Sequence, residues 1–430
     1  MNTQESQHSA PLTSRRNVLK TAATLAAGAI LAPRAITAAE RARSIGANDR
    51  IRIGIIGCGS RGIHAHMEGI YKHVKATNFE IVAVSDPWKV AREQANAKVK
   101  EWFGRDAKQF VSYRDLLALN DVDAVMIASP DHVHCLHLEA AAKAKKHVYV
   151  EKPMARELDE LISAVDAVKE AGIVAQVGTQ IRSLPEIYGA RELFKTGAFG
   201  KISRIEECRN NEKPYWYAYL KDVRREDVDY KEFLYNAPER PFRSDVYSGW
   251  YGYYEFSKGP IPGFGSHFID LVHYITGASC PKECVCLGGT FTWNDEHQFT
   301  APDCIQATWI YPEGFLVSSS NNLGNGYGCT RKLFGDQGVL DFNNWAAPTY
   351  LAEGAPNRAK GPIRGTNPIK PIERPDHFLD WLQCLRSGEK CNAPIEAGYQ
   401  HSIANIMAMK SYETGKKTIY DAEKRKIRTA

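Results

Sequence analysis

"IRIGIIGCGSRGIHAH", residues 51–66, decides the fold of this chain. An apolar run is followed at once by Gly57, Gly59 and Gly62 in GxGxxG spacing. In a strand–loop–helix unit the first glycine permits a tight turn, the second lets the backbone approach a pyrophosphate, and the third lets helix and strand pack closely. The stretch predicts the start of a dinucleotide-binding domain. The alternative is a glycine turn in a parallel sheet that binds no nucleotide.

Further β-rich runs follow up to residue 178, separated by longer segments with helical spacing. The runs are EIVAVSD, AVMIAS, HVYVE and IVAQVG. This alternation predicts a parallel sheet with crossover helices. The second run ends in Asp86, 24 residues after Gly62, where a carboxylate accepts hydrogen bonds from ribose hydroxyls and repels a 2′-phosphate. Asp86 therefore favours NAD, and the nearby Lys89 keeps NADP as the alternative.

The second half of the chain has a different pattern. After residue 201 strand-like runs follow one another without helices between them, which predicts a mostly antiparallel sheet that is open on one face. Aromatic residues crowd the stretch 215–257, either as a satellite core or as a wall beside a ligand. We expect an α/β fold: an N-terminal Rossmann doubly wound parallel sheet plus an α+β C-terminal domain with a large, open sheet. The predicted domains are 50–178 (Rossmann), 179–376 (substrate and oligomerisation sheet) and 377–430 (C-terminal helices that pack back on the body).

The first 39 residues have the composition of a targeting segment. Arg15 and Arg16 precede a mild, alanine-rich apolar run that is too short for a comfortable membrane span, and small residues follow it. This predicts a twin-arginine export signal at 1–39, a periplasmic or otherwise exported protein, and no stable membrane insertion after cleavage. A disordered basic leader is the alternative.

Composition excludes some partners and cofactors. The 430 residues are 43% hydrophobic and 24% charged, with a net charge of +5 and no basic block, so nucleic acid is not an expected partner. Of the ten cysteines the closest group is Cys280, Cys284 and Cys286, and neither a CxxC pair nor a nearby histidine completes a zinc set. We expect no metal and read the cysteines as small buried residues. A disulfide formed after export is the alternative.

Lys152 stands where open α/β sheets bind ligands. The run HVYVEKPMA ends a buried strand at Glu151 and Lys152, and Pro153 stops the strand because it has no N–H. The carboxyl end of a parallel strand faces the ligand crevice. A surface lysine is the alternative.

A third candidate site lies in "GPIPGFGSHFIDLVHYITG", residues 259–277. Ser266 is a good N-cap, which makes His267 the first residue of an amphipathic helix. Asp270 lies one turn further on and could fix the imidazole tautomer, as expected of a general base. The alternative is an ordinary histidine in the first turn of a capped helix.

ASPDHVH, HVYVEKPMA and the glycine fingerprint together resemble the Gfo/Idh/MocA oxidoreductases, over essentially all of the chain after residue 49. The tail resembles the exported branch of this family, which is related to glucose–fructose oxidoreductase and to NAD-dependent glycosidases. The resemblance implies that Lys152 contacts both substrate and cofactor, and that the protein is a homo-oligomer. It also implies cofactor contacts at Ser60 and Arg61 (phosphates), Pro130 and His134 (along the dinucleotide), Glu151 (nicotinamide ribose) and Gln180 (nicotinamide).

The family pattern DxGxHxxD is matched here at Gly265, His267 and Asp270, but Gly263 replaces its first acid. The implied function is an NAD(P)-dependent oxidoreductase acting on a sugar or polyol with a tightly held cofactor. His267 would take the hydroxyl proton and Lys152 would stabilise the alkoxide, with Lys152, His267 and Asp270 touching the substrate. One alternative is an NAD-dependent glycosidase that works through transient sugar oxidation and elimination. The other is a non-catalytic sugar or nucleotide sensor, which Gly263 would suit.

Overall fold

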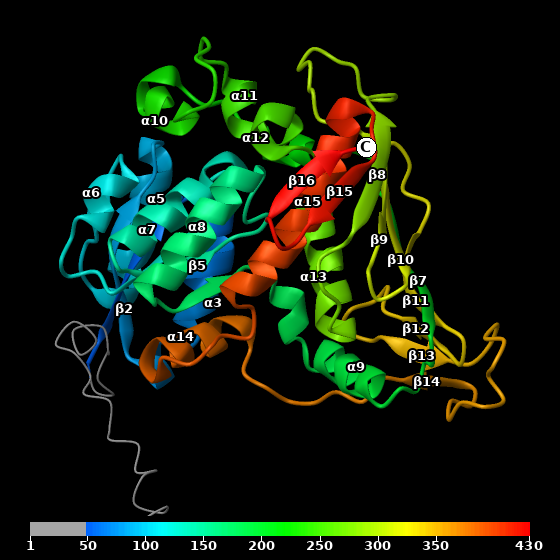
Figure 1. Ribbon diagram of the computed structural model, residues 1–430. Helices are drawn as coiled ribbons and strands as arrows, with labels where there is room; N and C mark the ends of the chain where they lie inside the picture. The colour runs from blue at the N-terminus through cyan, green and yellow to red at the C-terminus, as the bar shows by residue number, and fades with distance from the viewer. Residues whose placement is uncertain (1–48) are drawn as a thin grey trace, which may run out of the picture. The chain divides into compact units, whose positions relative to one another are not determined.

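The computed structural model describes residues 49–430, and the predicted export signal lies outside that part of the chain. The first half folds around a six-stranded sheet in which every pairing is parallel (Figure 1). Its strands, in spatial order, are β3 (Lys108–Phe110), β2 (Phe79–Ser85), β1 (Ile51–Ile56), β4 (Ala124–Ile127), β5 (His147–Val150) and β6 (Ala175–Val177). The order reverses between β1 and β4, which is the topological switch point where such sheets bind dinucleotides. The predicted Rossmann sheet is confirmed.

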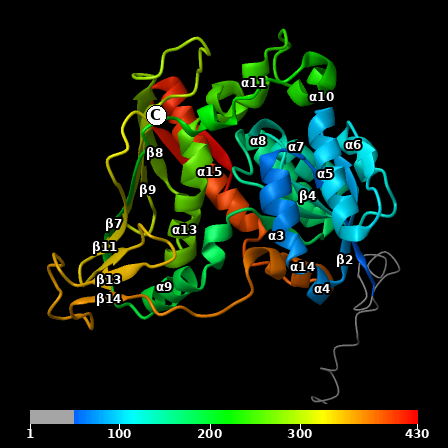
Figure 2. The same ribbon diagram turned by 180° about the vertical axis from the view of Figure 1, so that it is seen from behind.

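Helices cover both faces of this sheet. On one face the helices α7 (His134–Lys143) and α8 (Leu158–Ala171) pack on Val125 and Val148. The other face is covered by segments from both ends of the chain, as the view from behind makes plain (Figure 2). They are η1 (Arg61–Met67), α3 (Glu68–Tyr71), α4 (Val74–Thr77), α5 (Lys89–Phe103) and α14 (His377–Ser387), with the short α6 (Tyr113–Leu117) beside α7.

The second half is built on a ten-stranded sheet, antiparallel except for the parallel pair β7–β10. In spatial order its strands are β14 (Thr366–Pro368), β13 (Thr349–Leu351), β12 (Val339–Asp341), β11 (Cys329–Gly335), β7 (Ile202–Asn210), β10 (Leu316–Asn322), β9 (Cys304–Ile310), β8 (Glu283–Gly289), β15 (Thr418–Asp421) and β16 (Lys426–Thr429). The helices α9 (Pro185–Lys195), α13 (Ser266–Thr276) and α15 (Ile395–Thr414) share a core with one face of this sheet. On β8 and β9 buried residues alternate with exposed ones, so the predicted open sheet is confirmed.

The C-terminal segment is more than a pair of helices. The indole Nε1 of Trp381 in α14 donates to the carbonyl of Val148 at 3.1 Å, so α14 packs on the Rossmann sheet. After α15 the chain forms the hairpin β15–β16, which adds to the edge of the large sheet beside β8. Only helices were predicted at 377–430. The strands β15 and β16 have four residues each and are too short to be recognised from their periodicity.

The aromatic stretch serves both of the purposes that its sequence left open. It folds into short helices over a core that contains Trp216, Phe233 and Phe256, while Trp250 and Tyr251 line a cavity. The helices are η4 (Tyr215–Tyr219), α10 (Tyr230–Leu234), α11 (Ser244–Ser248) and α12 (Tyr254–Ser257). Among residues 49–430, no helix combines the length and the apolar composition needed to cross a bilayer.

Candidate functional site

A cavity of about 640 Å³ brings together most of the predicted site residues. Its lining includes Gly57, Gly59, Asp86, Lys152 and His267. These residues come from the carboxyl ends of the parallel strands and from the first turn of α13. The cavity therefore connects the predicted dinucleotide site with the predicted proton-transfer groups.

The glycine loop has the steric properties that a dinucleotide requires. Gly57 has φ +91°, and a Cβ there would meet the backbone of Ala128 and Ser129 at 2.5 Å. A Cβ on Gly62 would lie 2.0 Å from the carbonyl oxygen of Gly57, so helix and strand touch at this point. A Cβ on Gly59 would meet nothing within 4 Å, on a residue that lines the cavity. The loop is closed on the protein side and open on the ligand side, which fits a bound pyrophosphate.

This difference gives a paired prediction. Gly59→Ala should leave the melting temperature nearly unchanged but weaken NAD binding about tenfold or more, because its methyl group enters the space left for the pyrophosphate. Gly62→Ala should cost at least about 1–3 kcal/mol of stability, because overpacking against backbone forces strand and helix apart. Thermal denaturation and NAD titration of both variants test the pair. Equal loss of stability in the two variants would contradict it.

Asp86 follows directly on β2 and lines the cavity at its buried end. One carboxylate oxygen accepts the backbone N–H of Cys58 at 2.7 Å, and the other accepts that of Trp88 at 2.8 Å. Burial raises the pKa of Asp86 to about 6. Lys89, which left NADP as the alternative cofactor, pairs with Glu93 at 3.8 Å and does not line the cavity.

The raised pKa of Asp86 predicts the pH dependence of NAD affinity. The carboxylate is the form that accepts ribose hydroxyls, so it must lose its proton before NAD binds when the pH is below about 6. We expect the Kd for NAD to rise about tenfold between pH 7 and pH 5, measured by titration calorimetry. Asp86→Asn should bind NAD more weakly at pH 7 and show no such dependence. A Kd of the wild-type protein that stays constant over this range would contradict the assignment.

Glu151 is the centre of a buried ionic cluster. Its Oε1 lies 2.7 Å from a guanidinium nitrogen of Arg61, 2.9 Å from Nε2 of His66 and 3.0 Å from Nε2 of Gln180. Burial alone would raise the pKa of Glu151, but the Arg61 charge and the His66 hydrogen bond hold it well below the ordinary value. Glu151 lines the cavity, and its contact with the nicotinamide ribose stays a prediction.

Two predicted cofactor contacts take part in this cluster. Arg61 lines the cavity and its guanidinium binds Glu151, and its contact with the phosphates stays a prediction. Gln180, expected beside the nicotinamide, donates to the Tyr149 hydroxyl at 2.8 Å and to Glu151, and it does not line the cavity. Both side chains donate hydrogen bonds to Glu151, because a buried carboxylate needs donors.

Ser60, Pro130 and His134 all line the cavity, in the region predicted for the dinucleotide. The ring of His134 is held by the backbone: Nδ1 lies 2.8 Å from the carbonyl oxygen of Pro153, and Nε2 lies 2.7 Å from that of Ser129. Burial lowers the pKa of His134. The neutral imidazole has one N–H, so it donates to one of these two carbonyls and packs between the loops that follow β4 and β5.

Lys152 follows β5 and reaches across the cavity to the loop before α13. Its Nζ donates to the carbonyl oxygen of Gly263 at 2.9 Å. Burial lowers the pKa of Lys152, while Glu151 and Asp131 favour its charged form. Lys152 is half-buried and lines the cavity, which disfavours the alternative of an ordinary surface lysine.

His267 lies in the first turn of α13 and lines the cavity. Its Nδ1 is buried and has no hydrogen-bond partner within residues 49–430. Burial, followed by the charge of Lys152, lowers the pKa of His267 well below 6.5. The imidazole is therefore neutral at neutral pH and able to accept a proton.

Two expectations about the surroundings of His267 are wrong. Ser266 is not an N-cap, because the preceding residues, η7 (Ile261–Gly265), are already helical and the Ser266 hydroxyl donates back to the carbonyl of Pro262 at 2.6 Å. Asp270 does not hold the imidazole and does not line the cavity. Its two oxygens bind the guanidinium of Arg182 at 2.8 and 2.5 Å. A buried cation distant in sequence is a stronger partner for this carboxylate than a neutral ring.

The structure also shows what occupies the place of the missing acid. A Cβ on Gly263 would lie 2.7 Å from the hydroxyl oxygen of Tyr215, which is buried and has no hydrogen-bond partner among the described residues. Asp131 lines the cavity with one buried oxygen that is similarly unpaired, and burial raises its pKa to about 8. Neither residue was predicted from the sequence. The signal for Asp131 was its position in ASPDHVH, four residues after the end of β4.

Comparison with known proteins agrees with this geometry. Residues 51–179 match the model of the oxidoreductase family with an NAD-binding Rossmann fold. An uncharacterized oxidoreductase, YrbE, of Bacillus subtilis (strain 168) is 35% identical over 167 residues, 38% of this chain and 46% of its own. Levoglucosan dehydrogenase of Pseudarthrobacter phenanthrenivorans is 26% identical over 232 residues, 54% of this chain and 47% of its own. A glycosyl hydrolase family 109 protein 2 of Shewanella sp. (strain ANA-3) is 37% identical over 124 residues, 27% of this chain and 26% of its own.

The chain spans less than half the length of these curated relatives. A solved structure, levoglucosan dehydrogenase in complex with NADH and levoglucosan, superposes with a TM-score of 0.64 at 18% identity and covers 86% of this chain and 99% of its own. That likeness establishes the fold of both halves. Residues 51–179 are therefore an NAD-binding Rossmann domain of the Gfo/Idh/MocA oxidoreductase family.

Proposed function

We propose that this protein is an NAD(P)-dependent oxidoreductase that transfers a hydride between a hydroxyl-bearing carbon of a sugar or polyol and a tightly held nicotinamide cofactor. The observation that carries the proposal is the single cavity shared by the glycine loop, Asp86, Lys152 and His267. When bound, NAD supplies the hydride acceptor. The names of the levoglucosan dehydrogenases support the class of substrate.

The chain's own groups divide the proton chemistry between them. His267 is neutral and lines the cavity, so its imidazole can take the proton of the substrate hydroxyl. Lys152 is held above the cavity by the Gly263 carbonyl, and its ammonium stabilises the alkoxide that develops as the proton leaves. In this proposal His267 and Lys152 carry out the proton transfer without an acid at position 263.

The remaining walls suit a sugar ring. Aromatic side chains contribute much of the cavity lining, together with a few polar groups, as is usual in sites for small molecules. The aromatic residues are Tyr219, Trp250, Tyr251, Phe264 and Trp345. Asp131 is a polar residue in this lining.

A second candidate function is an NAD-dependent glycosidase that oxidises a sugar transiently, eliminates the aglycone and returns the hydride. The similarity over 124 residues to a glycosyl hydrolase family 109 protein favours it. A non-catalytic sensor is disfavoured, because both Lys152 and His267 line the cavity.

One experiment separates these functions. The purified protein is denatured, the released nucleotide is identified by mass spectrometry, and native protein is incubated with free sugars, polyols and aryl glycosides while reduced nicotinamide and free aglycone are followed separately. Reduction of the cofactor by a sugar or polyol is the expected result. Aglycone release without net reduction would establish the glycosidase. Failure to contain or bind nucleotide would overturn both enzymatic functions.

We also propose that the protein is exported in folded form by the twin-arginine route, with its cofactor loaded before export. The twin arginines at 15 and 16 and the apolar run after them support this. Fractionation of cells tests it, and a protein confined to the cytoplasm would contradict it.

We propose in addition that the open face of the ten-stranded sheet makes a homo-oligomer. Val285, Leu287 and Ile310 on that face are 48%, 76% and 47% exposed, and apolar side chains grouped on a strand face favour association. Light scattering that gives the mass of one chain would contradict this.

A further inference from the structure

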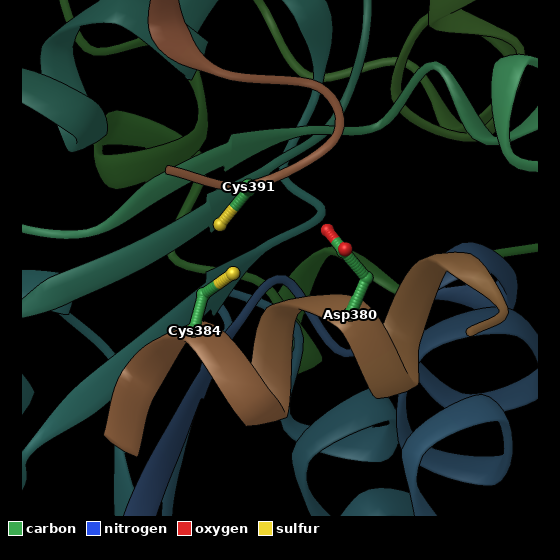
Figure 3. A group of neighbouring side chains, drawn as sticks. All are labelled: Asp380, Cys384 and Cys391. Carbon is green, nitrogen blue, oxygen red and sulfur yellow. The ribbon is translucent and has the colours of Figure 1, made fainter. Parts of the chain in front are cut away.

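Two cysteines and an aspartate gather at a site away from the cavity lining described above. Asp380 and Cys384 project from α14, and Cys391 reaches toward them from the segment that leads to α15 (Figure 3). One donor atom from each of the three residues lies within 4.8 Å of the others. Cys384 and Cys391 are 6% and 5% exposed, and both carry free thiols in this structure.

A metal ion fits this cluster less well than a bond between the sulfurs. The group offers three donors, whereas structural zinc sites are closed by four protein ligands. One oxygen of Asp380 already accepts the backbone N–H of Asn392 at 2.7 Å. The two thiols, in contrast, are close enough to share a hydrogen bond.

We propose that Cys384 and Cys391 form an intramolecular disulfide when the protein meets a disulfide oxidant. One cysteine attacks the oxidant as its thiolate, forming a mixed disulfide and releasing one thiol. The second cysteine then attacks the sulfur of the first and releases the other thiol. Two thiols of the protein are thereby oxidised, the oxidant's disulfide is reduced to two thiols, and Asp380 stands beside the sulfurs to receive a departing proton.

The bond would fix a segment that supports the candidate active site. Next to Cys391, the carbonyl of Asn392 accepts a hydrogen bond from Arg182 at 2.9 Å, and the carbonyl of Ala393 accepts the N–H of Val177 in β6 at 2.8 Å. Arg182 in turn binds Asp270 of α13, the helix that carries His267. The disulfide would therefore join α14 to the contacts that hold both the last parallel strand and the His267 helix.

The test uses the full chain, reduced and then exposed to oxidised glutathione with and without mild denaturant, since both thiols are buried. Free thiols are alkylated after unfolding, and linked peptides are identified by mass spectrometry. We expect one new crosslink, between Cys384 and Cys391, and a melting temperature about 3 °C or more above that of the reduced protein, because a loop of eight residues has been closed.

Matched variants make the result specific. Cys384→Ser/Cys391→Ser should melt at the same temperature in both redox states, whereas Cys284→Ser/Cys286→Ser, which removes two other buried thiols, should keep the shift. All ten cysteines alkylated after oxidation, or a crosslink between other cysteines, would overturn the proposal. So would one equivalent of zinc that stays with the untreated protein through desalting and is lost from the Cys384→Ser/Cys391→Ser variant.

Discussion

Lys152→Met should lower kcat by about a thousandfold or more while leaving the bound nucleotide in place. Methionine fills nearly the same volume but carries no charge, so the alkoxide that develops as the substrate loses its proton is left without its cation. The ammonium is held at 2.9 Å from the carbonyl of Gly263, directly over the cavity. Steady-state kinetics with the sugar identified in the substrate panel, together with the nucleotide content by mass spectrometry, measures both effects.

The control for this variant is Lys89→Met. Lys89 is an exposed lysine of the same domain that pairs with Glu93 and lies outside the cavity lining. It should retain full activity and full nucleotide content. If Lys152→Met also retained its activity, Lys152 would have no part in the proton chemistry. If it lost the nucleotide instead, its role would be in binding the cofactor.

His267→Gln should lower kcat by about 100- to 10,000-fold, the range typical for loss of a general base. Glutamine keeps a polar side chain in the cavity but cannot take up a proton. Because the pKa of His267 is lowered well below 6.5, the base is already deprotonated at neutral pH. With saturating cofactor and substrate, the kcat of the wild-type protein should therefore show no fall caused by this group as the pH is lowered from 8 through 6.5.

His273→Gln serves as the matched control in the same helix. His273 is buried two turns further along α13, with Nε2 2.9 Å from the Tyr311 hydroxyl, and does not line the cavity. It should lower stability but preserve kcat. Equal loss of kcat in the two variants would mean that α13 as a whole, and not the imidazole of His267, had been disturbed. An acid limb near pH 6.5 that disappears in His267→Gln would contradict the lowered pKa.

The parts of the fold that could be predicted from sequence are those encoded locally. The spacing of Gly57, Gly59 and Gly62 fixes a steric arrangement within six residues, and the alternating runs fix the parallel sheet. That Lys152 and His267 share one cavity followed from resemblance to a family, because 114 residues separate them and no pattern joins them.

The errors have a common physical cause, which is competition from distant residues. Asp270 is three residues from His267, but its carboxylate accepts a hydrogen bond from Arg182, 88 residues away. Gln180, which does not line the cavity, is bound by Glu151 in the same way. A sequence shows which groups need partners, but the choice among partners depends on which ones the fold buries together.

The contact between Tyr215 and Gly263 links the identities of two positions that are 48 residues apart. Because Lys152 is held by the main-chain carbonyl of residue 263, its anchor survives any change of side chain there. The room for such a side chain, however, is taken by the Tyr215 hydroxyl. Among homologous chains the two positions should therefore covary, a tyrosine accompanying glycine and a smaller residue accompanying aspartate. A relative with the acid would then differ from one without it at both positions. A chain with only one of the two replacements would be less stable than either.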